Sequence, residues 1–464
     1  MTETTRPPIV TVLGHVDHGK TTLLDAIRKS NVAGREAGGI TQSIGASVIT
    51  TKEGKKVTFI DTPGHAAFSA MRGRGANVAD IALLVVGADD GVKPQTKEAY
   101  SLIKSAKIPF IVVATKMDLP SASVETVYSE LEKEGVLFEG RGGDTPLVEV
   151  SARKNEGIEK LLEIISLVAE IHSVKGSKDA ALEAVIIETS KSKAGISVSV
   201  VVRNGSLTIG KNIYAQELIC RVKALFDASG KTVKEVLPGE GAAVLGFTFA
   251  PPVGTKIIDS PQSAQAETKE KQKRGKLGAE EVPVFLKAEN AGALEALLTS
   301  MPEKAVVVAS SVGELTTSDV LSAKNASALV LVFEAKVPHD VLKFAETEDV
   351  HVERFGIIYE LIQRLEEIIN KGLKVILGKA EVLASFPYEG KKIAGCKVLE
   401  GRIAKGDSLT LVREEKELGR AKAVSMKKQK QEITEAKAGE EFGVLLSPQL
   451  DFTIGDVLLS AANG

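Results

Sequence analysis

The sequence has only two cysteines, and none of its apolar runs is long enough to cross a bilayer. Cys220 and Cys396 are far apart and lack the spacing of metal ligands, which favours a protein of a reducing compartment. A membrane-spanning helix needs about 18 or more apolar residues in a row, and residues 1–8 contain no signal-peptide core. These absences predict a cytoplasmic protein that does not contact membranes.

The sequence also lacks a strong excess of charge of either sign. Its net charge of −2 at pH 7 excludes a globally basic nucleic-acid binder but leaves room for a local basic face. The apolar fraction of 43% and the charged fraction of 26% are ordinary for a globular protein, and 464 residues are too many for one core. We expect a monomer built from several domains.

A glycine-rich segment joins the first apolar strand to the first helix. Residues 9–13 predict a buried strand and residues 22–27 a helix, and between them lies Gly-x-x-x-x-Gly-Lys-Thr. In a P-loop of this kind the backbone N–H groups face phosphate, Lys20 reaches the β- and γ-phosphates, and the Thr21 hydroxyl binds Mg²⁺. The alternative is a strand–helix turn that binds nothing. The predicted phosphate-binding residues are Gly14, His15, Val16, Asp17, His18, Gly19, Lys20 and Thr21.

Four further apolar runs predict a mainly parallel sheet that is buried on both faces. They are Val57–Ile60, Ile81–Gly87, Ile108–Ala114 and Leu147–Val150. Ligand sites in such sheets lie at the carboxyl ends of the strands. The polar residues that follow each run are therefore the candidate site residues.

The motif after the first of these runs is Asp-Thr-Pro-Gly-His. Asp61 can hold Mg²⁺ through water, and the Gly64 N–H can reach a γ-phosphate. His65 then stands where a hydrolytic water must be oriented, which makes it the predicted catalytic residue. On its own the motif could equally be a Pro-Gly turn with a surface histidine.

Two later strand ends predict a guanine pocket. Asp118 can accept hydrogen bonds from the ring N–H and the exocyclic amine of guanine, and adenine lacks the donor at that edge. Lys116 can lay its stem along the purine, and the backbone at Ser151 can meet the guanine carbonyl. Each triplet alone could be a simple turn. The predicted guanine-binding residues are Thr115, Lys116, Asp118, Ser151, Ala152 and Arg153.

With these motifs in order, the first domain resembles the G domain of translational GTPases. Residues 37–46, Ala-Gly-Gly-Ile-Thr-Gln-Ser-Ile-Gly-Ala, are similar to the first switch of initiation factor two, and residues 57–118 are closest to its bacterial form. The resemblance implies GTP and GDP as ligands and Thr41 as the switch residue that closes onto Mg²⁺. Two positions depart from the family pattern: Ser43 replaces histidine, and Thr115 replaces asparagine.

The remaining chain predicts two small antiparallel barrels around a compact α/β domain. Gly turns and β-branched runs recur in one order after residue 177 and again after residue 373, which indicates an internal repeat. Chance agreement of turn signals is the alternative. The predicted layout is a G domain at 1–176, a β-barrel at 177–262, a linker at 263–281, an α/β domain at 282–354, a connecting helix at 355–372 and a second β-barrel at 373–464.

The last barrel resembles the domain of bacterial initiation factor two that recognises the formylmethionyl end of initiator tRNA. A blocked, neutral amino acid needs a small apolar pocket, and the RNA end needs lysines for its phosphates. The matching residues are Cys396, Lys427, Lys428, Glu441 and Gly443. Without the resemblance, Cys396 would be read as a core thiol. Three positions depart from the family: Lys428 replaces arginine, Gln429 replaces an aromatic residue, and Phe442 replaces a small one and either narrows the pocket or turns inward.

The sequence therefore predicts a multidomain GTPase that resembles the short form of bacterial initiation factor two, without its N-terminal extension. The resemblance implies that it delivers formylmethionyl initiator tRNA to the small ribosomal subunit, promotes subunit joining and hydrolyses GTP when the ribosome stimulates it. Two rivals stay open: an elongation-type tRNA-delivery GTPase, and a ribosome-associated regulatory GTPase that delivers no tRNA.

Overall fold

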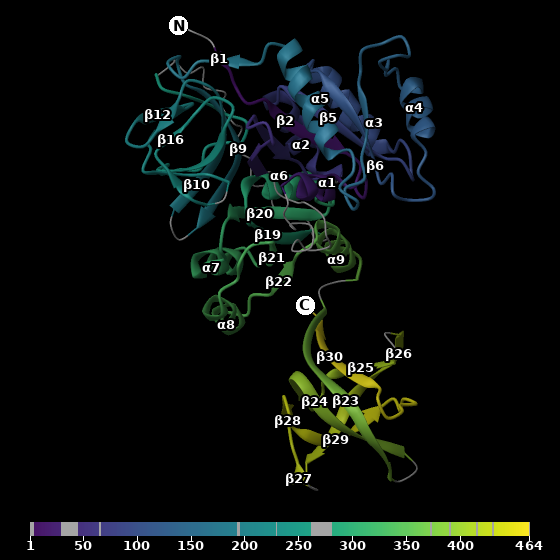
Figure 1. Ribbon diagram of the computed structural model, residues 1–464. Coiled ribbons are helices and arrows are strands. Elements are labelled where there is room, and N and C mark those ends of the chain that lie inside the picture. Colours follow the sequence, from purple (N-terminus) through teal and green to yellow (C-terminus); the bar gives the residue numbers. More distant parts are fainter. Residues whose placement is uncertain are drawn as a thin grey trace. The chain divides into compact units, whose positions relative to one another are not determined.

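The computed structural model describes residues 4–28, 45–64, 66–192, 195–228, 230–260, 281–371, 374–388, 391–413, 416–428 and 431–463 (Figure 1). The chain divides into two compact units, Met1–Ile362 and Gln363–Gly464. The boundary falls inside helix α9 (Ile358–Lys371). Each unit has hydrophobic cores of its own.

A six-stranded sheet forms the N-terminal part of the first unit. Its strands, in spatial order, are β3 (Gly45–Thr50), β4 (Lys56–Asp61), β2 (Ile9–Gly14), β5 (Ile81–Gly87), β6 (Phe110–Thr115) and β7 (Leu147–Glu149). Every neighbouring pair is parallel except β3 and β4. All residues of β2 and β5 are buried, as the continuous apolar runs predict.

Helices cover both faces of this sheet (Figure 1). One core contains residues of α1 (Lys20–Arg28) and α5 (Ile158–Ile171). The core on the other face contains residues of α2 (Ser69–Val78), α3 (Pro94–Ala106) and α4 (Val124–Lys133). Because the strands are parallel, the carboxyl ends of β2, β4, β5, β6 and β7 meet at one edge. A short pair, β1 (Thr4–Thr5) with β8 (Lys175–Gly176), and the 3-10 turn η2 (Ala66–Phe68) complete this part.

A curled antiparallel sheet follows in the first unit. Its strands, in spatial order, are β13 (Leu218–Arg221), β12 (Asn212–Ala215), β18 (Lys256–Ile258), β9 (Glu183–Ser192), β10 (Gly195–Asn204), β17 (Gly241–Leu245), β14 (Ala224–Phe226) and β15 (Thr232–Val233). Only Val222 and Lys223 separate β13 from β14, so the chain itself brings the two ends of this path together around one core. The short strands β11 (Leu207–Thr208) and β16 (Glu235–Val236) pair beside it.

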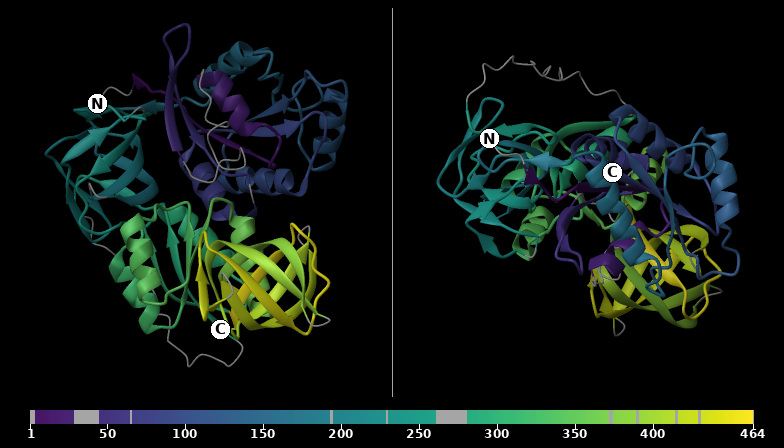
Figure 2. Two further views of the ribbon diagram at one scale, coloured as in Figure 1. Left: turned by 90° about the horizontal axis from the view of Figure 1, so that it is seen from below. Right: turned by 45° about the horizontal axis from the view of Figure 1, so that its top comes forward.

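The second unit is a closed six-stranded antiparallel barrel (Figure 2). Its main strands, in spatial order, are β23 (Lys374–Tyr388), β30 (Val457–Asn463), β25 (Ser408–Arg413), β26 (Lys416–Lys428), β29 (Glu441–Ser447) and β24 (Lys391–Ala404), with short β27 (Gln431–Glu432) and β28 (Glu435–Lys437) at its margin. The barrel closes because β23 pairs with both β30 and β24.

The two barrels share one strand order, which confirms the predicted internal repeat. Long β26 takes the place that β13 and β14 together occupy in the first barrel, and the remaining strands correspond in the order in which the chain forms them. The predicted multidomain fold class, with α/β and antiparallel barrel parts, is confirmed.

A four-stranded parallel sheet completes the first unit. Its strands are β20 (Ala305–Val312), β19 (Val282–Ala288), β21 (Leu329–Phe333) and β22 (Val352–Phe355), and its helices are α6 (Ala291–Ser300), α7 (Thr317–Asn325) and α8 (His339–Thr347). The prediction that the last helix begins at Phe355 was wrong, because the Phe355 carbonyl accepts a hydrogen bond from Glu334 N at the end of β22. The N-cap of α7 is Thr316, which forms a capping box with Asp319.

Helix α2 of the first sheet meets the start of α6 beside β9. The Glu188 carboxylate accepts a hydrogen bond from Gly292 N at 3.1 Å, and Arg74 pairs with Glu295 at 2.6 Å. Burial raises the pKa of Glu188 to about 7. The three sheets of the first unit therefore meet around one buried carboxyl group.

Most of the predicted linker, residues 263–280, lies outside the described residues. No helix within the described ranges has the length and apolar character that a membrane crossing requires.

Candidate functional site

Residues 14–19 form the loop between β2 and α1, and two glycines allow its path. An added Cβ at Gly14 would lie 2.3 Å from the Val85 carbonyl oxygen, so only glycine lets the loop pass this close to β5. Gly19 has φ +81°, in the region that favours glycine. The loop ends directly at the first turn of α1, where backbone N–H groups and the helix dipole favour an anion.

Lys20 is buried beneath this loop. Its ammonium group donates hydrogen bonds to the carbonyl oxygens of Gly14, at 3.0 Å, and of His15. Burial lowers the pKa of Lys20 to about 8, although the nearby Asp61 carboxylate raises it. Gly64 is so close that an added Cβ would stand 2.3 Å from Lys20 Nζ. The loop lysine and the glycine after β4 therefore lie side by side, as phosphate binding requires.

Asp61, at the end of β4, is a buried carboxylate with a free oxygen. Its Oδ1 atom has no hydrogen-bond partner among the described residues, and burial raises its pKa to about 6, against the charges of Arg28 and Lys20. The residues that the structure describes contain no group of three or more His, Cys, Asp or Glu that could hold a metal ion. An oxygen from Asp61 and the hydroxyl of Thr21 fit Mg²⁺, which takes few protein ligands when phosphates supply others.

Arg72, in α2, holds the segment after β4 in place. The guanidinium group is fully buried, donates to the Pro63 carbonyl oxygen at 3.1 Å and pairs with Glu98 at 2.7 Å. Gly64 is thereby fixed beside the loop lysine. The predicted catalytic His65 and the predicted switch residue Thr41 lie outside the described residues, as does Ser43.

Asp118 and Ser151 meet at the ends of β6 and β7. Ser151 Oγ donates to Asp118 Oδ1 at 2.8 Å, and this hydrogen bond lowers the pKa of Asp118. Lys116 has φ +60° and pairs through its ammonium group with Asp89 at 2.9 Å. The carboxylate of Asp118 is thus oriented and ionised, as a double acceptor for guanine must be.

One cavity of about 390 Å³ joins the phosphate end to the guanine end. The predicted residues that line it are Val16, Asp17, Gly19, Lys20, Thr21, Gly64, Thr115, Lys116, Asp118, Ala152 and Arg153. Gly14, His15, His18 and Ser151 support this cavity without being among its lining residues. Thr22 and Leu119 line it but were not predicted; each directly follows a predicted residue, and that adjacency was the available signal.

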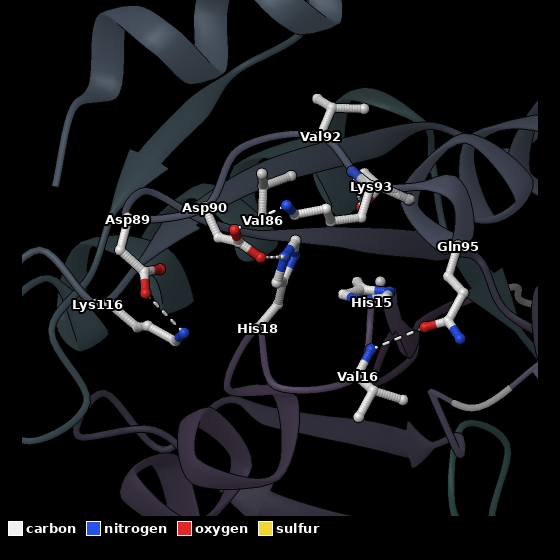
Figure 3. Close-up of polar contacts among 12 residues, drawn as sticks. His15, Val16, His18, Val86, Asp89, Asp90, Val92, Lys93, Gln95 and Lys116 are labelled. Atoms are coloured by element: carbon white, nitrogen blue, oxygen red, sulfur yellow. Dashed lines mark hydrogen bonds and ion pairs between the residues drawn. The ribbon is translucent and has the colours of Figure 1, made fainter. Parts of the chain in front are cut away.

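Two histidines brace the loop from behind rather than facing the cavity (Figure 3). His18 is fully buried, its Nε2 lies 3.8 Å from Asp90 Oδ2, and burial lowers its pKa to about 4. Val16 N donates to Gln95 Oε1 at 2.9 Å beside His15 (Figure 3). Asp90 and Gln95 reach the loop from the segment after β5 and from α3, a placement that depends on the folded sheet.

In the second unit, all five residues predicted for the tRNA end line one cavity of about 560 Å³. They are Cys396, Lys427, Lys428, Glu441 and Gly443. The floor has no side chains, because Gly395 of β24 pairs with Gly443 of β29. Cys396 lines the cavity but is only 1% exposed and packs in the barrel core beside its strand partner Phe442. Burial raises the pKa of its thiol to about 12, so the thiol stays neutral.

Three other residues define the walls of this cavity. Phe442, 4% exposed, turns inward and packs in the barrel core, although it is among the residues that line the cavity. Phe386, 55% exposed, stands over Gly395, whose added Cβ would lie 2.9 Å from its ring. Glu440 pairs with Lys428 at 2.8 Å. Phe386 and Glu440 were not predicted as site residues, and no motif marks them.

Comparison with known families matches three parts of the chain. Residues 5–170 match the elongation factor Tu GTP binding domain, residues 181–260 match elongation factor G domain 2, and residues 258–366 match translation-initiation factor 2.

The chain is similar over nearly its whole length to curated proteins named translation initiation factor IF-2. It is 40% identical to that of Persephonella marina, covering 97% of this chain and 55% of the relative. It is 39% identical to that of Caldanaerobacter subterraneus subsp. tengcongensis, covering 98% of this chain and 69% of the relative. It is 38% identical to that of Dehalococcoides mccartyi, covering 98% of this chain and 82% of the relative. The chain thus spans between about half and four fifths of the length of these relatives.

Among solved structures, GDP-bound aIF5B from Aeropyrum pernix aligns with a TM-score of 0.48 and 28% identity, over 98% of this chain and 92% of that one.

Proposed function

Because the chain belongs to the translation initiation factor IF-2 family, we propose that it is a GTPase that carries formylmethionyl initiator tRNA to the small ribosomal subunit and promotes subunit joining. The observation that carries the proposal is the pair of cavities. One is lined by a P-loop lysine and an oriented Asp118, and the other gathers all five residues expected at the tRNA end.

The first cavity is the proposed GTP site. Lys20 and the backbone of residues 14–21 hold the phosphates, while Asp118 accepts two hydrogen bonds from guanine, with Ser151 keeping its carboxylate in position. Lys116, Ala152 and Arg153 form the walls around the base. Adenine offers no ring N–H at that edge, so Asp118 supplies the discrimination.

Thr21 and Asp61 are the residues that would hold Mg²⁺, which would neutralise part of the phosphate charge. Thr41 is the proposed switch residue, which would close onto Mg²⁺ when the γ-phosphate is bound. Gly64 would donate its backbone N–H to the same phosphate. His65 orients the attacking water once the ribosome places it, so hydrolysis by the isolated chain is slow.

The second cavity is the proposed site for the end of initiator tRNA. Gly395 and Gly443 leave a flat floor, and Phe386 gives an apolar wall that suits a blocked, uncharged amino acid, while Cys396 is a neutral thiol in the barrel core behind the floor. Lys427 and Lys428 supply positive charge for the RNA backbone, and Glu441 is an acceptor on a neighbouring strand. Burying an ionised α-amino group against the Phe386 ring costs more than burying a formyl amide there.

Competition between nucleotides tests the GTPase proposal. We expect guanine nucleotides to bind the full chain at least about 100-fold more tightly than adenine nucleotides, because only guanine satisfies Asp118. We also expect added ribosomes to raise GTP turnover and to leave ATP turnover unchanged. Equal binding of ATP and GTP would contradict the proposal.

Gly443→Ala tests the second cavity. An added Cβ at this position lies 3.4 Å from Ile393 Cγ2, an ordinary contact, so the barrel is expected to fold normally. The methyl group fills part of the floor and should weaken binding of formylmethionyl-tRNA about tenfold, the cost of a misplaced methyl-sized group. Binding is measured by titration with the full chain and labelled tRNA.

Ser408→Ala is the matched control, because Ser408 is an exposed residue of β25 that does not line the cavity. Its tRNA affinity should equal that of the unmodified chain. If Gly443→Ala binds as tightly as the control, the tRNA end does not occupy this cavity, and the regulatory GTPase without a tRNA cargo becomes the better account.

A further inference from the structure

Thr115 ends β6 at the bottom of the nucleotide cavity, and its hydroxyl group already has partners. Its oxygen lies 2.6 Å from the carbonyl oxygen of His18 and 3.2 Å from that of Val86, and the residue is only 3% exposed. Both partners are acceptors. A threonine hydroxyl carries one proton, so that proton is donated within the protein.

The closer partner belongs to the P-loop. An added Cβ on Gly19, the residue after His18, would lie 3.9 Å from Thr115 Oγ1, so the side chain sits directly under the loop. Neither His18 ring nitrogen has a hydrogen-bond partner among the described residues, and the ring points towards Asp90 instead (Figure 3). The Thr115 hydroxyl therefore links the end of β6 by a hydrogen bond to the loop that faces the phosphates.

Because the Thr115 hydroxyl donates its proton to a carbonyl oxygen within the protein, it has no proton to donate to a base. Guanine presents two acceptors, N7 and O6, on the edge away from the groups that Asp118 reads. An acceptor needs a donor, and Thr115 has only lone pairs left to present. Lys116, the next cation along the turn, is paired with Asp89 at 2.9 Å. Ala152 and Arg153 also line the cavity, and their backbone N–H groups are the donors that we expect at O6.

We propose that Thr115 positions the P-loop through the His18 carbonyl and leaves guanine N7 without a hydrogen-bond partner, so that base selection rests on Asp118. This inference rests on the proposed function, because it assumes that guanine enters this cavity. It makes Thr115 a determinant of nucleotide affinity and selectivity that acts through the loop rather than through the base.

The test compares GDP with 7-deaza-GDP, in which a carbon replaces N7, by calorimetric titration of the full chain. We expect the unmodified chain to bind the two nucleotides with equal affinity. Thr115→Asn replaces the single O–H donor with two N–H donors, so one can hold the His18 carbonyl and the other can reach N7. This variant should prefer GDP over 7-deaza-GDP about tenfold, the contribution of one hydrogen bond.

Two further variants test the hydrogen bond to the loop. Thr115→Val removes the hydroxyl and should weaken GDP and 7-deaza-GDP binding alike, by about tenfold. Thr115→Ser keeps the hydroxyl and should restore both affinities. Thr145→Val, at a buried threonine that does not line the cavity, is the matched control and should bind both nucleotides as the unmodified chain does.

Several outcomes would overturn the inference. A clear preference of the unmodified chain for GDP over 7-deaza-GDP would show that N7 has a partner. Unchanged affinities in Thr115→Val would show that this hydrogen bond does not position the loop, and a Thr115→Asn variant without selectivity would show that N7 lies elsewhere. If the unmodified chain instead binds ADP as well as GDP, the proposed GTP site itself fails, and that result is distinguishable from the others.

Discussion

Replacing Asp118 with Asn is expected to weaken GTP binding about 10,000-fold, because a site built to satisfy two donors of the base then presents a donor of its own. The structure supports a large effect, since Ser151 holds the carboxylate in one orientation and keeps it ionised through its hydrogen bond at 2.8 Å. The Asn side chain can donate to a carbonyl at the same place. Xanthosine triphosphate carries that carbonyl, so the variant should prefer it over GTP.

Competition of GTP and xanthosine triphosphate against a fluorescent nucleotide measures this change. Asp144→Asn is the matched control, because Asp144 is exposed and does not line the cavity. Its preference for GTP should be unchanged. An Asp118→Asn variant that kept its GTP affinity would show that guanine is read elsewhere.

Replacing Lys20 with Met is expected to weaken binding of GTP about 100- to 1,000-fold, because it removes a buried cation from charged phosphate. The variant should still fold. Burial lowers the pKa of Lys20, which means that the nucleotide-free protein disfavours the charged ammonium group, so its removal relieves a desolvation cost. The hydrogen bonds to Gly14 and His15 offset part of that relief when they are lost.

Nucleotide titration and thermal unfolding of the nucleotide-free protein together measure this prediction. Lys133→Met, at an exposed position of α4, should change neither. Unaltered GTP affinity in Lys20→Met, with the fold intact, would mean that the loop does not bind phosphate.

A feature could be predicted from the sequence where one short segment contains both its secondary structure and its functional residues. The P-loop is such a case, since the strand, the glycines and the helix that define it lie within residues 9–28. The strands β4 to β7 were also predictable, because burial on both faces leaves continuous apolar runs. The repeat of two barrels was visible from the order of their turns.

The remaining features depend on contacts between distant residues. Gln95 reaches Val16 from α3, and Phe386 stands over Gly395 only after β23 and β24 have paired. The hydrogen bond between the buried Glu188 of β9 and Gly292 N at the start of α6 depends on distant elements meeting. The sequence of one segment does not indicate which distant residues will contact it, so Gln95, Phe386 and Glu188 were not predicted.

Strand pairing explains one prediction that was wrong, at Phe355, and one that the sequence left open, at Phe442. Phe355 fits the apolar pattern of α9, but the ladder with β21 holds it in a strand instead. Phe442 could have faced the pocket or the core, and the alternation set by Gly443 on the floor directs it inward. Both outcomes follow from pairing with a neighbouring strand.

The preference for a formylated amino acid tests the central proposal most directly. The measurement is the equilibrium affinity of the full chain for formylmethionyl initiator tRNA and for the same tRNA carrying unformylated methionine. We predict at least about tenfold tighter binding of the formylated form, because burying a charged amine against the Phe386 ring costs more than burying a neutral amide. Equal affinity for the two tRNAs would contradict initiator tRNA delivery.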